Sequence, residues 1–507
     1  MTTFSRSPTP AITVFPTHKL SPINRKIYSG FLEHLGRCIY TGIYDPTNPN
    51  KSLIDERGFR RDVLAALKPL DIPVMRYPGG NFCATYHWKD GIGPRASRPA
   101  RCDLAWGNVE TNHFGTDEFM EWVTELGAEP FLCLNFGTGD LDEALHWLEY
   151  CNGTEDTYWA NQRRRNGHPE PYNVKYWGLG NEVWGPWQIN QMKKEDYAER
   201  AIQWAKAFKL QDPNVELILC GKEGATGWDL HVIKECVLPQ AKDGLGQEAL
   251  NLVDMVSIHG YTASEEHYEN ATAPLGNERA IEVCTGLIDL AFAENGLLVD
   301  QKKPKICFDE WNVWSWERAP GSKGGEETYT LSDALAVATW LNVLVRQSAN
   351  VEMACIAQSV NVISPLMTSV DGITRQTTWW PYELFCRFMR GHLVAVNLAS
   401  EVYEGPTKPA WIRAVRETPF MDVSATLDED GCLTMCVVNY HLEEEMETIL
   451  TGAQGIVSVY SITGEHHRVT NMEGKQEVEV KEAEWDSSKG VFVFPKCSVT
   501  FLRWKTA

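Results

Sequence analysis

The chain has 507 residues, of which 43% are hydrophobic and 23% are charged, a composition typical of a soluble globular protein. This length exceeds what one compact core usually holds, so we expect two domains, one of them large. The formal net charge of -21 argues against nucleic-acid and anionic-membrane partners, because their phosphate groups would be repelled.

Strand-like and helix-like segments alternate along the first three quarters of the chain. The expected strands are residues 27–34, 73–81, 129–135, 173–180, 215–220, 255–259, 304–309 and 353–358. The expected helices are residues 56–70, 116–126, 141–150, 194–210, 228–236, 280–294, 332–347 and 379–389. Eight strands separated by helices predict an α/β fold, a (β/α)₈ TIM barrel.

After about His392 the pattern changes to short alternating runs separated by Gly, Asp or Asn. These runs are residues 402–403, 421–426, 433–438, 457–460, 478–480 and 491–494. They predict a C-terminal antiparallel β-sandwich, to which the N-terminal run near Ile12 adds a strand. The predicted domains are therefore an N-terminal strand segment at residues 1–20 that joins the sandwich, a catalytic barrel at 21–391, and the sandwich at 392–507.

The cysteines and the N-terminus bear on the cellular compartment. The 14 cysteines form neither a C-x-x-C motif nor a zinc-like pairing with histidine, and thiols beside strand residues are typical of small buried side chains in a reducing compartment. We find no signal-peptide pattern, and the most apolar helical run, residues 334–345, is too short to span a bilayer. We therefore expect a cytoplasmic protein without membrane contact.

Two acidic residues stand where strand-like runs stop. Glu182 follows the run at 173–180, and Glu310 follows the run at 304–309. Active sites of parallel barrels lie at the C-terminal ends of the strands, so these two acids could form the paired carboxylates of a glycoside hydrolase. The alternative is that each is an ordinary polar residue at the start of a loop, but the matching contexts favour the pair.

Several longer motifs resemble the α-L-arabinofuranosidases of glycoside hydrolase family 51. They are Arg76-Tyr77-Pro78-Gly79-Gly80-Asn81-Phe82, Asp103-Leu104-Ala105-Trp106, Val109-Glu110-Thr111-Asn112, Phe114-Gly115-Thr116-Asp117-Glu118-Phe119, Gly180-Asn181-Glu182, Gly185-Pro186-Trp187-Gln188 and Phe308-Asp309-Glu310-Trp311-Asn312. The resemblance extends across the whole chain. It implies a retaining, exo-acting enzyme with Glu182 as general acid/base and Glu310 as nucleophile, an arabinose-containing oligosaccharide from arabinan or arabinoxylan as substrate, and a homo-oligomer.

The resemblance also implies a furanose pocket made by Glu33, Arg76, Asn81, Asn181, Tyr261, Trp314 and Gln358. Asn181 matches the family's donor to the sugar 2-hydroxyl, and Glu33 and Asn81 match its ligands for the outer hydroxyls. Arg76 is the candidate for a buried arginine that keeps the nucleophile ionised. Tyr261 stands near the nucleophile, and the remaining two close the pocket. For each residue the alternative is a structural hydrogen bond or a packing role.

The sequence departs from the family pattern on the leaving-group side. Val183-Trp184 follows the acid, Gly260 separates His259 from Tyr261, and the loop at 315–330 is short and rich in glycine. These departures leave the aglycone preference open. The chain contains no H-E-x-x-H, G-x-S-x-G or P-loop motif, so we expect neither a metal nor a cofactor.

Three functions are compatible with these patterns: an exo-acting α-L-arabinofuranosidase, another retaining barrel glycosidase such as an endoglucanase or β-xylosidase, and a non-catalytic sugar-binding protein. Fold and carboxylates alone do not select the sugar. The presence of both Glu182 and Glu310 argues against the third function. The pocket residues Glu33, Asn81 and Tyr261 favour a small furanose and hence the first.

Overall fold

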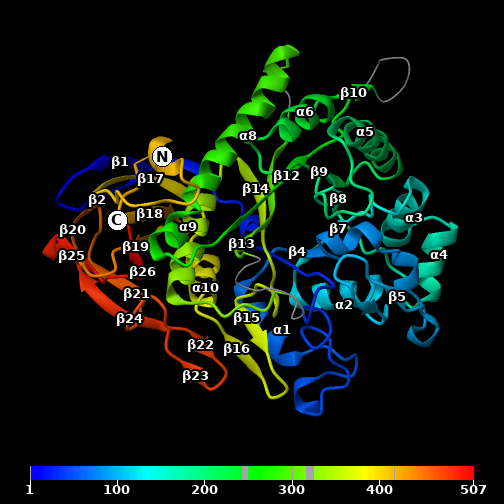
Figure 1. The fold of residues 1–507 in the computed structure, drawn as a ribbon, viewed down its shortest axis with the longest axis horizontal. Helices are drawn as coiled ribbons and strands as arrows, with labels where there is room; N and C mark the ends of the chain where they lie inside the picture. The colour runs from blue at the N-terminus through cyan, green and yellow to red at the C-terminus, as the bar shows by residue number, and fades with distance from the viewer. Residues whose placement is uncertain (1, 242–248, 298–301, 316–324, 416, 507) are drawn as a thin grey trace.

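The computed structural model describes residues 2–241, 249–297, 302–315, 325–415 and 417–506. Eight parallel strands close into a barrel in the order β12-β13-β14-β3-β4-β7-β8-β9, which confirms the predicted (β/α)₈ fold (Figure 1). They are β3 (Ser29–Phe31), β4 (Val74–Tyr77), β7 (Glu129–Cys133), β8 (Tyr176–Leu179), β9 (Glu216–Cys220), β12 (Met255–Thr262), β13 (Lys305–Val313) and β14 (Val351–Ile356). Their side chains are almost all buried, as is usual for parallel strands covered on both faces.

Helices surround the barrel. They are α1 (Arg61–Leu67), α2 (Thr116–Leu126), α3 (Leu141–Asn152), α4 (Tyr158–Arg165), α5 (Lys194–Gln211), α6 (Gly227–Cys236), α7 (His267–Thr272), α8 (Leu275–Glu294), α9 (Leu331–Arg346) and α10 (Trp379–Phe388). The sequence pattern did not predict α4, because three consecutive arginines interrupt its apolar face. Arg163 compensates: its side chain is buried and donates hydrogen bonds to the backbone carbonyls of Tyr150, Gly153 and His168.

The second domain is a ten-stranded, mostly antiparallel sheet along the path β24-β21-β26-β19-β18-β17-β2-β20-β25, with β1 beside β17. Only β1 with β17 and β2 with β20 pair in parallel. The strands are β1 (Thr2–Arg6), β2 (Ala11–Pro22), β17 (His392–Ser400), β18 (Met421–Leu427), β19 (Cys432–Asn439), β20 (Met446–Thr451), β21 (Ile456–Ile462), β24 (Val480–Asp486), β25 (Val491–Phe494) and β26 (Ser498–Lys505). The N-terminal strand β2 thus lies inside this sheet, beside β17.

Some strands of the second domain differ from the sequence pattern. Strands β17, β20 and β26 lie outside the predicted runs, whereas the predicted run at 402–403 forms only an isolated bridge between Val402 and Pro419. Residues 401–420 instead leave the sheet, and the short helix α11 (Ile412–Val415) lies within this connection. The domain boundaries at residues 21 and 392 stay predictions.

Helix α9 joins the two domains. Its residues from Leu331 to Val345 are all buried, because α9 packs against barrel strand β13 on one side and against β18, β19 and β26 on the other. At its C-terminus, the buried guanidinium of Arg346 binds Glu278 of α8 at 2.9 Å and Asp422 of β18 at 2.9 Å. The most apolar run of the sequence is therefore an interdomain helix.

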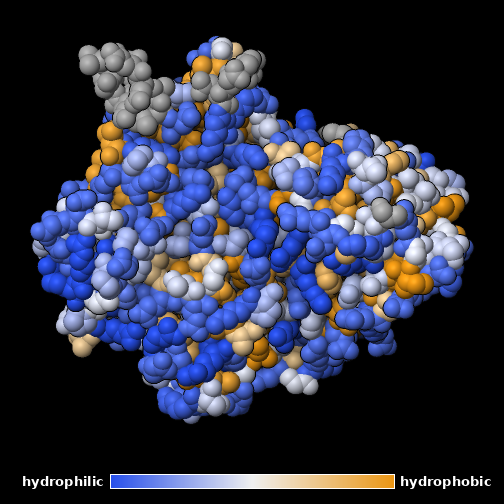
Figure 2. Space-filling view, turned by 180° about the vertical axis from the view of Figure 1, so that it is seen from behind, coloured by the Kyte–Doolittle hydropathy of each residue, from blue (hydrophilic) through white to orange (hydrophobic). Residues whose placement is uncertain are grey.

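The surface agrees with the composition. The face shown in Figure 2 is mostly hydrophilic, with apolar residues in scattered patches. Within the described ranges, the helices are all too short or too polar to cross a membrane.

We predict that deleting residues after about 392 yields insoluble protein. The deletion would expose one side of α9 and leave the Arg346 guanidinium without Asp422, and an apolar surface of that size promotes aggregation. Expression of residues 1–391, followed by measurement of the soluble fraction, tests this. A soluble and active barrel from the truncated chain would contradict both the prediction and the structural role that we assign to the second domain.

Candidate active site

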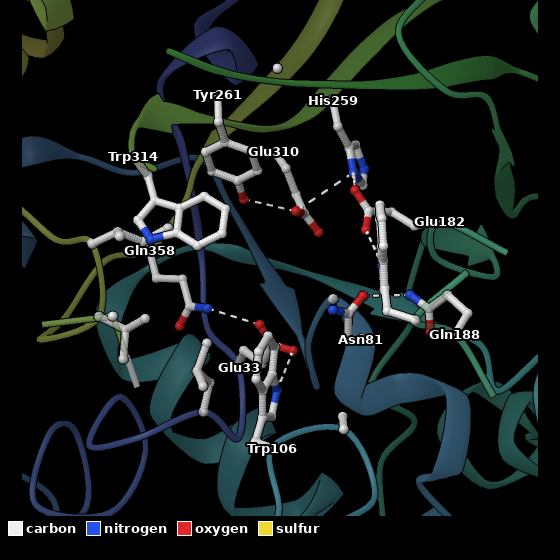
Figure 3. A pocket seen from close by; sticks show the side chains of 18 of the residues that line it. Glu33, Asn81, Trp106, Glu182, Gln188, His259, Tyr261, Glu310, Trp314 and Gln358 are labelled. Atoms are coloured by element: carbon white, nitrogen blue, oxygen red, sulfur yellow. Dashed lines mark hydrogen bonds and ion pairs between the residues drawn. The ribbon is translucent and has the colours of Figure 1, made fainter. Parts of the chain in front are cut away.

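A cavity of about 1990 Å³ opens at the C-terminal ends of the barrel strands. Seven of the nine predicted site residues line it: Glu33, Asn81, Glu182, Tyr261, Glu310, Trp314 and Gln358 (Figure 3). Arg76 and Asn181 lie beneath the lining, in contact with it. The cavity also reaches Lys408, Pro409 and Trp411 of the second domain, beyond the last of the predicted site residues, Gln358.

Glu182 is presented by a sharp turn after β8. Gly180 adopts a left-handed conformation with φ of +87°, and a side chain there would lie 2.9 Å from Val183 and 3.0 Å from Phe136. Glu182 itself has φ of +41°, a conformation that non-glycine residues rarely adopt. Such local strain is common where a backbone aims a functional side chain.

Glu310 lies inside β13, whereas the sequence pattern ended this strand at Asp309. The pairing with β12 shifts register between Ser257 and His259, and the pairing with β14 shifts between Phe308 and Trp311. Irregularities of this kind change the direction of side chains, and they are frequent beside active sites. As a result the consecutive carboxylates Asp309 and Glu310 both reach Arg76, although neighbouring side chains on a regular strand point to opposite faces.

The two predicted catalytic carboxylates face each other across His259. The Nδ1 atom of His259 lies 3.0 Å from Glu182 Oε1 and 3.5 Å from Glu310 Oε2. One oxygen of each carboxylate and one imidazole nitrogen all lie within 4.8 Å of one another. The side chains come from β12, β13 and the turn after β8, so only the closed barrel brings them together.

Arg76 anchors this cluster from below. Its guanidinium donates to Glu310 Oε1 at 2.7 Å and to Asn181 Oδ1 at 2.6 Å, and its Nε lies 3.3 Å from Asp309 Oδ2. Burial alone would lower the pKa of Arg76, but the charges of Asp309 and Glu310 outweigh burial and raise it well above its usual range. Arg76 is therefore a permanent cation under the carboxylates.

His259 is a second buried cation. Burial favours the neutral ring, but Glu310 and Asp309 outweigh burial and raise the pKa of His259 well above its ordinary value. Its Nε2 lies 3.3 Å from Asp309 Oδ1. The pKa of Asp309 is correspondingly lowered: burial would raise it, but Arg76 and His259 favour the carboxylate.

Tyr261 completes the surroundings of Glu310. Its hydroxyl donates to Glu310 Oε2 at 2.8 Å, so each oxygen of this carboxylate accepts one strong hydrogen bond. Burial, followed by the charge of Glu310, raises the pKa of Tyr261 well above its usual value, which keeps the hydroxyl a donor. The Trp314 ring packs edge-on against Tyr261 with the ring centroids 5.4 Å apart.

Glu33 forms the opposite wall of the pocket. Its Oε1 accepts hydrogen bonds from Phe82 N and Trp106 Nε1, both at 3.1 Å, and its Oε2 accepts from Gln358 Nε2 at 2.9 Å. Burial, followed by the charge of Glu310, raises the pKa of Glu33 to about 8. Gly80 separates the two acids, and a side chain there would lie 2.9 Å from Glu310 and 3.4 Å from Glu33.

Asn81 and Asn181 lie between Glu33 on one side of the cavity and the pair Glu182 and Glu310 on the other. Asn81 Oδ1 accepts hydrogen bonds from Gln188 Nε2 and, at 3.4 Å, from Asn181 Nδ2. Asn181 is oriented in turn by Arg76. With its oxygen occupied, Asn81 has its amide nitrogen left to donate into the cavity.

Several residues of this cluster were not predicted as site residues: Trp106, Trp187, Gln188, His259 and Asp309. All but Asp309 line the cavity. Trp187 Nε1 donates to Glu182 Oε2 at 3.0 Å, and Trp106 contacts Glu33. Their motifs were noticed in the sequence, and His259 ends an expected strand, but no local signal says that their side chains turn inward.

Within the described ranges, Glu182, His259 and Glu310 are the one group of side chains that could hold a metal ion. The two predicted catalytic carboxylates and the histidine between them would converge in the same way without a metal, so convergence alone is no evidence for one. The expected absence of metal and cofactor stays a prediction. In the glycine-rich loop, Gly325 and Glu326 line the cavity, and residues 316–324, with Gly321 and Gly324, lie outside the described residues.

The chain matches two protein families, the α-L-arabinofuranosidase 1 domain over residues 66–278 and the α-L-arabinofuranosidase C-terminal domain over residues 309–498. It is 61% identical over 508 residues to a probable α-L-arabinofuranosidase C of Aspergillus terreus, with 100% of both chains covered. It is also 36% identical to an intracellular exo-α-(1→5)-L-arabinofuranosidase of Halalkalibacterium halodurans, with 86% of each chain covered.

Solved structures agree with these sequence relatives. A family 51 α-L-arabinofuranosidase of Thermotoga petrophila superposes with a TM-score of 0.87 at 38% identity, covering 98% of this chain and 100% of that one. An arabinose complex of the α-L-arabinofuranosidase of Thermotoga maritima superposes with a TM-score of 0.85 at 38% identity and the same coverage.

The raised pKa of Glu33 predicts a pH dependence of stability. A carboxyl group with a folded-state pKa of about 8 and an ordinary value of 4.5 stabilises the folded protein below about pH 4.5, and this contribution is lost as the pH rises through about 8. Glu33→Gln stays neutral throughout. The free energy of unfolding of the wild type, measured in urea, should therefore fall relative to that of Glu33→Gln between about pH 5 and pH 8. Parallel curves for the two proteins would contradict the assignment.

Proposed function

The chain belongs to the α-L-arabinofuranosidases of glycoside hydrolase family 51, and from this premise we propose that it is an exo-acting enzyme that releases terminal α-L-arabinofuranosyl residues from arabinan or arabinoxylan oligosaccharides by double displacement. One observation carries the mechanism. Oxygens of Glu182 and Glu310 lie within 4.8 Å of each other, which supports direct attack by one carboxylate, since retaining enzymes hold the pair roughly 5–5.5 Å apart and inverting enzymes about 6.5–9.5 Å.

Glu310 suits the role of nucleophile. The hydrogen bonds from Arg76 and Tyr261 fix its orientation, and it is among the buried carboxylates of the cavity. In the first step, a Glu310 oxygen attacks C1 of the α-linked sugar and forms a β-linked glycosyl-enzyme. The bond from C1 to the leaving oxygen breaks at the same time.

Glu182 suits the role of general acid/base. Trp187 and His259 hold its two oxygens, and its side chain is more exposed than that of Glu310, 14% against 8%, on the side where an aglycone would leave. Glu182 protonates the leaving oxygen in the first step. In the second step Glu182 takes a proton from water, which attacks C1 from the face opposite Glu310. The bond from C1 to Glu310 breaks, Glu310 leaves as a carboxylate, and the sugar regains the α configuration.

Two basic and two acidic side chains face one another beside the reacting atoms. Arg76 and His259 lie between 2.7 and 3.5 Å from Asp309 and Glu310. Fixed charges that already surround the reacting atoms need no reorganisation when the oxocarbenium-like transition state develops.

The opposite wall supports a terminal sugar. Glu33, Trp106 and Gln358 hydrogen-bond to one another and close the cavity beyond the carboxylates. Gln358 Oε1 is buried and has no hydrogen-bond partner among the described residues, so it is an acceptor that a sugar hydroxyl would satisfy. The arabinose complex of the Thermotoga maritima relative supports an arabinose-containing substrate.

An endoglucanase activity is less well supported. An endoglucanase must accommodate a polysaccharide chain that runs through its site, and the wall formed by Glu33 and Gln358 would block such a chain.

The cellular location and the oligomeric state remain proposals. The intracellular relative from Halalkalibacterium halodurans supports a cytoplasmic location. The homo-oligomer is a prediction that light scattering of the purified protein would test.

The two carboxylate roles predict different azide products. Glu182→Ala should still form the glycosyl-enzyme from an aryl arabinofuranoside, because an activated leaving group needs little protonation, and should then stall because no base activates water. Azide needs no base, so it should restore turnover and give the α-arabinofuranosyl azide after two inversions. Glu310→Ala should give the β-azide by one inversion, or no product.

Nuclear magnetic resonance of the isolated azides distinguishes the two configurations. The opposite pattern would mean that the roles are exchanged. Activity like that of the wild type in either variant would remove that residue from the mechanism.

We predict that the choice of sugar depends on Asn81. Truncation would leave a buried polar partner unsatisfied, which costs about 1–3 kcal/mol, so Asn81→Ala should lower kcat/KM for nitrophenyl arabinofuranoside by about five- to a hundredfold. Xylopyranoside and glucopyranoside serve as comparison substrates. Intact arabinofuranoside turnover together with a changed rate on either pyranoside would refute the pocket assignment.

A further inference from the structure

The connection between β17 and β18 is longer than the sheet requires. These strands are paired and antiparallel, with His392 opposite Leu427, and such neighbours are usually joined by a loop of about two to five residues. Residues 401–420 connect them instead. Connections longer than about 12–15 residues in compact domains usually have a function of their own.

This connection extends to the mouth of the barrel. Its residues Lys408, Pro409 and Trp411 line the same cavity as Glu182 and Glu310. Pro409 packs against Gly276 at the start of α8, where an added side chain would lie 3.1 Å from Pro409 Cδ.

Internal hydrogen bonds and burial shape this connection. Thr407 Oγ1 donates to Pro409 O at 3.1 Å and Arg413 donates to Gly405 O at 2.8 Å, both within the segment. Ile412 is buried, and a side chain at Gly276 would lie 3.5 Å from Ile412 Cδ1, so Ile412, like Pro409, packs against the start of α8.

Trp411 is unusual among the tryptophans. Within the described ranges, the exposed large hydrophobic side chains include two tryptophans, Trp187 at 55% and Trp411 at 44%, and both line this cavity. The position of the Trp187 side chain at the cavity is explained by its hydrogen bond to Glu182. An exposed indole on a cavity wall is costly in water, and ligand sites typically combine such apolar surfaces with a few polar groups.

Polar groups of that kind line the same cavity as Trp411. Lys408 lies on the same segment, and Asn277 of α8 lines the neighbouring wall. The cavity volume of about 1990 Å³ exceeds the roughly 300–1,000 Å³ of typical small-molecule sites, so space remains beyond the sugar that contacts the carboxylates.

We propose that Trp411, with Lys408 and Asn277, forms a distal subsite that binds a sugar ring of the aglycone, remote from the bond that is cleaved. This inference rests on the proposed function and deepens it, because it makes the second domain part of substrate selection. A ring stacked on Trp411 contacts the enzyme equally in the ground state and the transition state. The subsite should therefore lower KM for long substrates and leave kcat almost unchanged.

The test compares Trp411→Ala with the wild type on an aryl arabinofuranoside and on linear α-1,5-linked arabino-oligosaccharides of increasing length. The readout is the ratio of kcat/KM for each oligosaccharide to that for the aryl glycoside, which ends at the scissile bond. We expect this ratio to fall about tenfold, through KM, once the chain is long enough to reach Trp411. Trp411→Phe keeps an aromatic face and should recover most of the loss.

Tyr158→Ala is the matched control, because it removes another exposed aromatic ring, from α4, outside the cavity. It should leave the ratio unchanged at every length. An equal loss on the aryl glycoside and the oligosaccharides would assign Trp411 a structural role and overturn the proposal, as would an unchanged ratio at every length. If the wild type did not cleave the aryl arabinofuranoside, the proposed function would fail instead. Calorimetric titration of the same oligosaccharides into both proteins would still test the subsite.

Discussion

The site depends on the pairing of two buried cations with buried carboxylates. Arg76 and His259 each contact Asp309 and Glu310, and every distance lies between 2.7 and 3.5 Å. Charges removed from water are costly unless each finds partners of good geometry. Loss of one member would leave an uncompensated charge in the barrel, so this cluster constrains the strands that carry it.

This constraint explains the local backbone. The register shifts in β12 and β13 let two consecutive carboxylates reach the same guanidinium, and the left-handed turn after β8 brings Glu182 to His259. Both the register shifts and the left-handed turn are departures from regular barrel geometry. Next to the site, the fully buried rings of Trp311 and Trp340 pack against each other, with ring centroids 5.7 Å apart.

The second domain contributes to the site in two ways. Through α9 it covers the barrel and holds Arg346 between Glu278 and Asp422, which fixes the outer frame. Through the connection at 401–420 it also contributes to the wall of the cavity itself. The second domain therefore lines the cavity in addition to supporting the barrel.

The sequence by itself determined the periodic features and the acids. Alternating strands and helices predicted the barrel, and Glu182 and Glu310 were identified because each stands at the end of an apolar run. Local patterns carry such information, since burial on both faces of a parallel strand leaves a nearly continuous apolar stretch. The motif resemblance added Glu33, Asn81, Tyr261 and Gln358, and the structure brings all of these to one cavity.

Only the tertiary structure decided how far the strands continue and what bridges the acids. The pattern ended one strand at Asp309, where the apolar run stops, and nothing nearby in the sequence indicates that Arg76 and His259 contact the two carboxylates that follow. Trp411 was equally hidden, since its contact with the cavity arises where a loop of one domain meets a helix of the other. Pairings between residues hundreds of positions apart are set by chain closure and packing, which no local pattern encodes.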